Sequence, residues 1–269
     1  MRSSACAKRT CAERAATSQP SRPFVQGSRS TRFISLISGN IIALNDHASV
    51  LHYYHHERQR LSERERHSFL IDAGASVNGY ASDITRTYSA RSDEFAELIG
   101  AMEAMQQALC AAVKPGVNYP DIHMLAHRHV AGILNRFGFV DLDADAIVST
   151  KISSTFLPHG VGHFIGLQVH DVGGFLADPH GMTIEKPEGH PYLRLTRVVE
   201  PRQVFTIEPG LYFIETLLAD LRKSANGKHV KWDKVEAFRK FGGIRIEDDL
   251  VVTEEGNENL TRGAFARIS

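Results

Sequence analysis

The chain has 269 residues, 42% of them hydrophobic and 23% charged, which is an ordinary balance for a protein that folds around an apolar core. Its 31 basic and 31 acidic side chains cancel, so overall charge gives no reason to expect nucleic acid or an anionic membrane as a partner. No apolar run reaches the length of a membrane span, and three scattered cysteines are too few for a disulfide framework. We therefore expect a cytoplasmic protein.

Residues 1–39 differ in composition from the rest of the chain. Seven basic residues but only one acidic residue precede position 34, and the segment lacks apolar periodicity. We expect a disordered basic leader here. A transit peptide has this composition, and so does an arbitrary basic tail, so composition leaves both interpretations open.

Strands are predicted next. Residues 40–54 carry β-branched and apolar residues around an Asn-Asp break, which predicts two short strands. Residues 68–74 and 80–89 then predict a hairpin whose turn is Asn78-Gly79.

Two helices follow. The first is expected from Ser92, as N-cap, to the residues before Pro115, with apolar side chains at three-to-four spacing. The second is expected from about Pro120 to Gly138. Beyond Lys151 the chain is Gly-rich and strand-like, and strands and helices mix without a regular βαβ alternation. The predicted fold class is therefore α+β.

Two carboxylates lie at the ends of the predicted hairpin. Asp72 and Asp83 would lie about 5 Å apart at Cβ if directly opposite, or about 7–8 Å if diagonal, and both separations suit cations that bridge them. The alternative is that Asp72 caps the turn and Asp83 faces solvent.

Further donors follow in the sequence. Residues 156–174 are Gly-rich and hold His159, His163 and His170, and Glu208 and Glu247 end or lie within apolar strands. Four acids and one neutral imidazole would be balanced by two divalent cations. Oxygen-dominated ligands favour Mn²⁺, with Co²⁺, Fe²⁺ or Zn²⁺ as alternatives. Two such ions can activate water between them, so hydrolysis of an amide is the expected chemistry.

His123 and His127 are spaced i,i+4 on the second predicted helix, a spacing that can bind zinc. The Glu of an H-E-x-x-H motif is missing, and no acid lies nearby in sequence. We expect these two histidines to face solvent.

Four motifs appear in order along the chain: "DAGASVNGYASDITRT", "PHGVGHFIGLQVHDVGG", "TIEPGLYF" and "GGIRIEDD". Together they resemble the dinuclear-metal peptidases of the pita-bread fold, the family of methionine aminopeptidase, aminopeptidase P and prolidase. "HPYLRLTR" and the long insertion between the last two acids are most similar to the Xaa-Pro dipeptidase (prolidase) branch.

The resemblance implies two bound metal ions with a bridging hydroxide. The implied metal ligands are Asp72, Asp83, His163, Glu208 and Glu247. Asp83 and Glu247 would bridge the ions, Glu208 would also move a proton, and Arg245 would orient the bridging carboxylates.

The resemblance also implies a substrate site. His52, His159 and His170 would hydrogen-bond the substrate or its tetrahedral intermediate, and Arg194 would hold the terminal carboxylate of a dipeptide. The implied reaction is hydrolysis of Xaa-Pro dipeptides with release of proline. Three alternatives stay open: aminopeptidase P-type cleavage of longer Xaa-Pro-peptides, an inactive module used for binding, and a phosphotriesterase side activity.

The resemblance begins near Asn40, so we expect residues 40–269 to form a partial catalytic domain behind an unrelated leader. The family's curved antiparallel sheet with helices on its outer face is expected, without the N-terminal domain and the two leading helices of the catalytic domain. Full-length family members of this kind are expected to be homodimers, and the missing parts would remove much of the dimer contact.

Overall fold

The computed structural model describes residues 34–36, 40–55, 58, 60–178 and 180–268. Strands, α-helices and two 3₁₀ helices (η) alternate irregularly, which confirms the α+β class. The elements in chain order are β1 (Ile34–Leu36), β2 (Ile41–Leu44), η1 (Asn45–Ser49), β3 (Ser68–Ala73), β4 (Ala75–Val77), β5 (Tyr80–Ala81), β6 (Ile84–Ser89), α2 (Glu94–Ala112), α3 (Tyr119–Arg136), α4 (Ala144–Ser149), α5 (Ile152–Phe156), β7 (Val204–Ile207), β8 (Gly210–Tyr212), α6 (Glu215–Lys223), η2 (Ala225–His229), α7 (Trp232–Arg239), β9 (Gly243–Arg245), β10 (Asp248–Val252), β11 (Asn257–Asn259) and α8 (Leu260–Ile268).

The strands pair in antiparallel fashion in four small sheets, with the orders β1-β4-β5, β2-β3-β6, β11-β10-β7 and β8-β9. A bridge between Thr85 and Glu247 links β6 to the residue that precedes β10. This link brings the N-terminal hairpin and the C-terminal strands, far apart in sequence, to one place.

The predicted hairpin forms. β3 pairs with β6 over its whole length, and the narrower β4–β5 pair continues it to a turn at Asn78 and Gly79. Both turn residues have positive φ, 55° and 86°, as a tight hairpin turn of this kind requires. Asp72 lies opposite Thr85, and Asp83 immediately precedes β6.

The prediction of two strands in residues 40–54 was partly wrong. Only the first forms, as β2, and Asn45–Ser49 is a 3₁₀ helix instead. Asn45 takes a positive φ of 56°, and its side-chain oxygen accepts the backbone N–H of His67 at 2.7 Å. This local bond turns the chain away from an extended course.

The two predicted helices are present as α2 and α3. The cap of α2 differs by one residue from the prediction: Asp93, not Ser92, accepts the N–H of Ala96 at 3.1 Å. A carboxylate at this position also interacts favourably with the helix dipole. The apolar stripe of α2, from Phe95 to Leu109, is buried as its spacing predicts.

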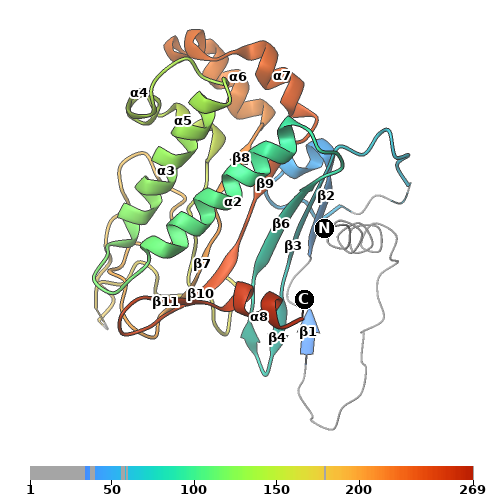
Figure 1. Ribbon diagram of the computed structural model, residues 1–269. Coiled ribbons are helices and arrows are strands. Elements are labelled where there is room, and N and C mark those ends of the chain that lie inside the picture. Colours follow the sequence, from blue (N-terminus) through green and yellow to red (C-terminus); the bar gives the residue numbers. More distant parts are fainter. Residues whose placement is uncertain (1–33, 37–39, 56–57, 59, 179, 269) are drawn as a thin grey trace.

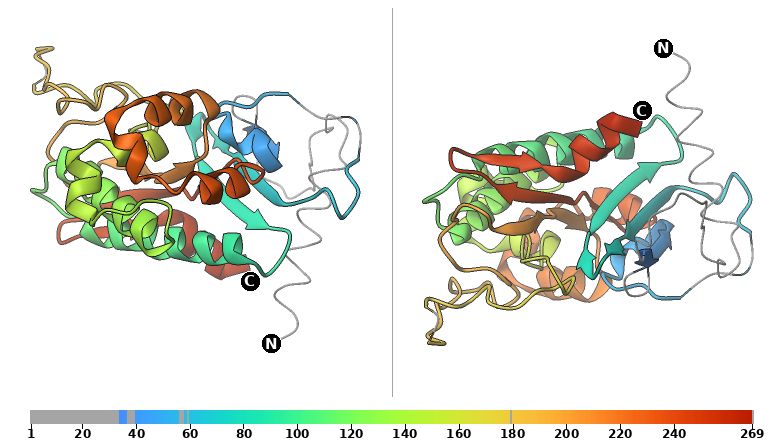
Figure 2. Two further views of the ribbon diagram at one scale, coloured as in Figure 1. Left: turned by 90° about the horizontal axis from the view of Figure 1, so that it is seen from above. Right: turned by 90° about the horizontal axis from the view of Figure 1, so that it is seen from below.

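Helices cover one side of the strands. In Figure 1, α2 and α3 run side by side across the strands, with α6 and α7 at one end and α8 at the other. The main core lies between these helices and the strands. Both views in Figure 2 show part of the long connection between α5 and β7 projecting from the body.

Most of the predicted leader, residues 1–39, lies outside the described residues, and its described part, Ile34–Leu36, pairs with β4. Among the described helices, none is both long enough and apolar enough to cross a membrane.

Candidate metal centre

The five predicted ligands come from five separate segments and line one cavity of about 710 Å³. They are Asp72 in β3, Asp83 before β6, His163 in the connection between α5 and β7, Glu208 after β7 and Glu247 before β10. Tertiary structure therefore brings together the residues that the sequence singled out. The volume lies within the usual range for small-molecule sites.

His163 is the centre of this group. Its Nδ1 lies 2.9 Å from the carbonyl oxygen of Phe164, so Nδ1 carries the proton and donates it there. The unprotonated Nε2 then faces carboxylate oxygens of Asp83, Glu208 and Glu247 at 3.7, 3.5 and 3.8 Å. When the three carboxylates are ionised, they and the imidazole lone pair have no hydrogen-bond donor among them, whereas a cation can be bound by all four.

The backbone around His163 depends on a glycine. His163 exchanges hydrogen bonds with Thr206 of β7, through its N–H to Oγ1 at 3.2 Å and its carbonyl at 2.9 Å. A Cβ at Gly162 would lie 2.0 Å from the Thr206 carbonyl oxygen and 2.2 Å from the Tyr119 hydroxyl. Only glycine lets the connection approach β7 closely enough to place the imidazole beside Glu208.

The carboxylates repel one another. Burial, then the charges of Asp72 and Glu208, raise the pKa of Asp83 to about 9. Burial raises the pKa of Glu208 to about 8, and burial with the neighbouring Asp83 raises the pKa of Glu247 well above its ordinary value. A buried cluster of this kind holds protons near neutral pH unless cations compensate its charge. The donor set therefore fits divalent metal ions.

Arg245 fixes the other side of the cluster. It is buried, and its Nη2 donates to Asp72 Oδ2 at 2.6 Å while Nη1 donates to the Tyr212 hydroxyl at 3.0 Å. His159 donates Nδ1–H to the Gly160 carbonyl at 2.7 Å, so its Nε2, at 2.9 Å, accepts the Tyr212 O–H. Burial and Arg245 lower the pKa of His159 to about 4, in keeping with this neutral tautomer.

Three residues of the site were not predicted from sequence. Thr85 donates to Glu247 Oε2 at 2.6 Å, Tyr212 joins Arg245 to His159, and Asp249 accepts the backbone N–H of Asp83 at 3.1 Å. Thr85 and Tyr212 stand inside motifs quoted above, but hydroxyl groups in strands are common. The role of Thr85 follows only from its pairing with Asp72 and with Glu247, and that of Tyr212 only from its contacts with Arg245 and His159.

The predicted substrate residues lie on the open side of the same cavity. His52, His170 and Arg194 are exposed side chains in its lining. The His170 ring meets that of His163 edge to face, with centroids 4.3 Å apart and an interplanar angle of 70°. No ion pair joins Arg194 to an acid within the described ranges, so its guanidinium is available to an anionic ligand.

The prediction for His123 and His127 was wrong. Both lie on α3 but are buried, 1% exposed each, and they meet His190 of the connection between α5 and β7. The sequence gives the spacing of a helix, but it does not say which of its faces another segment will cover.

The sequence profile of metallopeptidase family M24 matches residues 18–254. The chain belongs to this family. The match begins 22 positions before the predicted domain start at Asn40 and includes every predicted site residue.

The most similar relatives found include two curated Xaa-Pro dipeptidases. That of Stenotrophomonas maltophilia strain R551-3 is 55% identical over 85% of this chain and 51% of the relative. That of Colwellia psychrerythraea is 54% identical over 83% of this chain and 50% of the relative. The chain thus spans about half the length of the curated relatives it matches.

Solved structures of aminopeptidase P share the fold. Aminopeptidase PepP of Pseudomonas aeruginosa superposes with a TM-score of 0.65 at 29% identity, over 85% of this chain and 45% of the other. Zinc-substituted Escherichia coli aminopeptidase P in complex with product gives 0.64 at 28%, over 85% and 44%. The fold is the pita-bread fold that the motifs predicted.

Proposed function

We propose that this chain carries the active site of a divalent-metal-dependent Xaa-Pro dipeptidase. The observation that supports it best is the convergence of His163 Nε2 on three carboxylates at 3.5–3.8 Å, with the cationic Arg194 in the same cavity. The metal site and the anion-binding group would act on opposite ends of one small peptide.

Five residues would hold two ions: Asp72, Asp83, His163, Glu208 and Glu247. Their mostly oxygen donors favour Mn²⁺, with Co²⁺, Fe²⁺ and Zn²⁺ as alternatives. The bound ions would supply Lewis-acid activation of water and of the scissile carbonyl. The protein's own part is to hold these ligands in place. Arg245 holds Asp72, Thr85 holds Glu247, Asp249 holds the backbone of Asp83 and the Phe164 carbonyl orients His163.

The remaining groups would position substrate and move protons. Arg194 would bind the terminal carboxylate of the dipeptide, where a guanidinium can form two parallel hydrogen bonds. His52 and His170, exposed in the cavity, would hydrogen-bond the substrate. Glu208 would carry a proton to the proline nitrogen, which leaves from a tertiary amide without an N–H of its own.

His159 has a different position from the one its motif suggested. Both its ring nitrogens are used by Gly160 and Tyr212. We therefore propose that it orients Tyr212, and through it Arg245, in place of a direct hydrogen bond to the substrate.

The direct test is proline release from Ala-Pro by the purified chain in Mn²⁺. Asp83→Asn should lower kcat/KM at least about 100-fold, because Asp83 would hold the metal ions whose Lewis-acid chemistry is worth several kcal/mol. Asp220→Asn, an exposed acid of α6, is the matched control and should leave the rate unchanged. Preference for Ala-Pro-Ala over Ala-Pro would favour the aminopeptidase P alternative, and a folded chain that binds no metal would favour the inactive module.

A further inference from the structure

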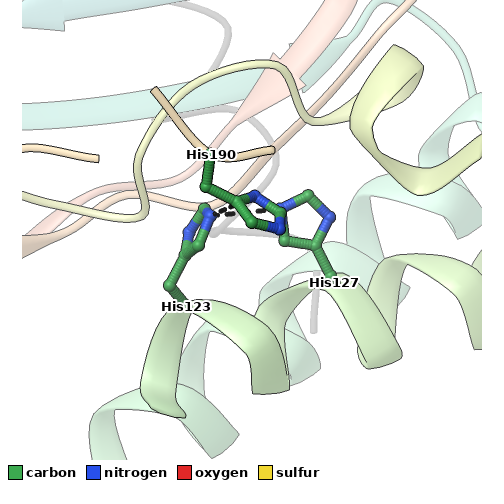
Figure 3. A group of neighbouring side chains, drawn as sticks. All are labelled: His123, His127 and His190. Atoms are coloured by element: carbon green, nitrogen blue, oxygen red, sulfur yellow. Dashed lines mark hydrogen bonds between the residues drawn. The ribbon is translucent and has the colours of Figure 1, made fainter. Parts of the chain in front are cut away.

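A second group of possible metal ligands lies outside the cavity lining described above. The rings of His123, His127 and His190 meet pairwise, with centroids 4.6–4.7 Å apart. One ring nitrogen from each lies within 4.8 Å of the other two, and no acid or cysteine belongs to the group. Figure 3 shows two of the rings projecting from α3 and the third reaching them from the overlying connection.

The contacts converge on one atom. His123 Nε2 lies 2.9 Å from His190 Nδ1 and 3.2 Å from His127 Nε2. A ring nitrogen has either one lone pair or one N–H, in the ring plane, so it cannot align well with two partners at once. Three nitrogen lone pairs that share a central cation have no such conflict.

The distances suit a small cation. Zinc bonds imidazole nitrogen at about 2.0–2.1 Å, so nitrogens on a tetrahedral ion are about 3.3–3.4 Å apart. The two close distances here, 2.9 and 3.2 Å, need shifts of only a few tenths of an ångström. Three imidazole donors without an oxygen ligand match Zn²⁺ better than Mn²⁺.

The surroundings favour ligation by neutral imidazoles. Burial lowers the pKa of His123 to about 2 and that of His127 to about 3, so both rings keep a lone pair. The second nitrogen of His127, Nδ1, lies 3.1 Å from Ser153 Oγ. An N–H donated to a fixed oxygen in this way is the usual support of a metal-binding histidine. The positive charge of Lys151 lowers the pKa of His190 and would also repel a metal cation at this site. Metal binding would therefore depend on the three nitrogen donors.

We propose that His123, His127 and His190 form a structural Zn²⁺ site, separate from the dinuclear centre. Such a site would fasten residues 183–196 to α3. His190 stands four positions before Arg194, and Tyr192 and Arg194 line the cavity. The zinc would therefore hold the segment that carries the proposed carboxylate-binding arginine.

The test uses a background variant, Asp83→Asn with Glu247→Gln, that removes two charges from the crowded acids and weakens the dinuclear centre. Metal-free protein is titrated with ZnCl₂ by calorimetry. We expect one Zn²⁺ per chain, bound at least tenfold more weakly after a further His190→Ala change. His180→Ala, an exposed histidine of the same connection, is the matched control and should leave zinc affinity unchanged.

A second measurement does not depend on the folding of the His190 variant. Zn²⁺ should raise the melting temperature of the background variant, because it binds the native state. Co²⁺ in its place should give the visible absorption of a tetrahedral site. No zinc-dependent rise in melting temperature, or equal zinc affinity with and without His190, would overturn the proposal. These readouts use a variant that lacks two of the five candidate ligands of the dinuclear centre, and they do not measure peptidase activity. A failure here therefore leaves the proposed peptidase activity untouched, and a failure of the peptidase test leaves the zinc site untouched.

Discussion

Two basic side chains, Lys186 and Arg194, come from the connection between α5 and β7 and line the cavity, but their surroundings differ. Lys186 donates to the Pro191 carbonyl and lies 4.7 Å from the centre of the Phe175 ring. Arg194 has no ion-pair partner in the described residues and is exposed. Arg194 is therefore the better candidate for a substrate carboxylate.

Replacement of Arg194 by Met should raise KM for Ala-Pro about 10- to 100-fold, because a hydrogen bond to a charged group contributes about 1.5–3 kcal/mol. Ala-Pro-amide lacks the carboxylate, so its kinetics should hardly change in the same variant. Lys186→Met is the paired control. Equal effects of the two substitutions on KM for Ala-Pro would show that Arg194 has no special part in binding.

The role of Tyr212 depends on its hydroxyl group. Its hydroxyl joins the buried Arg245 to His159, so Tyr212→Phe leaves a donor and an acceptor without partners. We expect a loss of about 1–3 kcal/mol in the free energy of unfolding, measured by urea denaturation. Tyr192→Phe removes an exposed hydroxyl and should change stability little. A Tyr212→Phe chain as stable as the parent would contradict the hydrogen-bonded path drawn here.

At the scale of elements, two adjacent acids at the start of β10, Glu247 and Asp248, have different partners. Both are buried, but Glu247 faces His163 at the candidate metal centre, whereas Asp248 faces two arginines. Arg86 of β6 and Arg262 of α8 each donate to Asp248 at 2.6 Å. Asp248 thus fastens a strand and a helix to β10, and neighbouring acids in one motif have different tasks.

Arg86→Ala should therefore destabilise the fold by about 2–4 kcal/mol, because it leaves a buried carboxylate with one guanidinium partner in place of two. The matched control is Arg222→Ala, since the Arg222–Glu236 pair is exposed and contributes about 0–1 kcal/mol. Urea midpoints compare the two variants. If the two substitutions lower the free energy of unfolding equally, the hydrogen bonds to Asp248 do not stabilise the contact between β6, β10 and α8.

At the scale of the whole molecule, folding concentrates negative charge from distant parts of the chain. The acids in β3, before β6, after β7 and before β10 share one buried site, in which the Arg245 guanidinium forms an ion pair with Asp72. Metal binding and folding are then coupled, because bound cations remove the repulsion that folding creates.

This coupling predicts a pH dependence for the metal-free chain. The pKa of Asp83 is raised to about 9 and that of Glu208 to about 8, so between about pH 4 and 9 the folded state binds more protons than the unfolded state. Stability should therefore fall as pH rises through this window. Saturating Mn²⁺ should raise the melting temperature more at pH 8 than at pH 6, measured by calorimetry. Equal shifts at the two pH values would be the contrary result.

The sequence by itself located the two long helices, the hairpin turn and the candidate ligands, but it did not predict the helices α5 to α8 beyond Lys151, which was expected to be strand-like. Hydrophobic spacing located α2 and α3, Asn78-Gly79 located the hairpin turn, and the four motifs supplied the five candidate ligands in order. These features are local, since periodicity and turn chemistry act over a few residues. One local prediction failed because of a distant contact: residues Asn45–Ser49 form a 3₁₀ helix and not a strand, and the Asn45 side chain is bonded to His67, 22 positions away.

Only the tertiary structure decided which side chains meet. Thr85 joins the centre because β6 pairs there with the residue before β10. His123 and His127 are buried where His190, from the connection between α5 and β7, contacts them. Helical spacing determines which residues share a face, but what packs on that face depends on contacts between segments far apart in the chain. For this reason the sequence predicted that His123 and His127 face solvent, whereas in the folded chain they meet His190 and form a candidate second metal site.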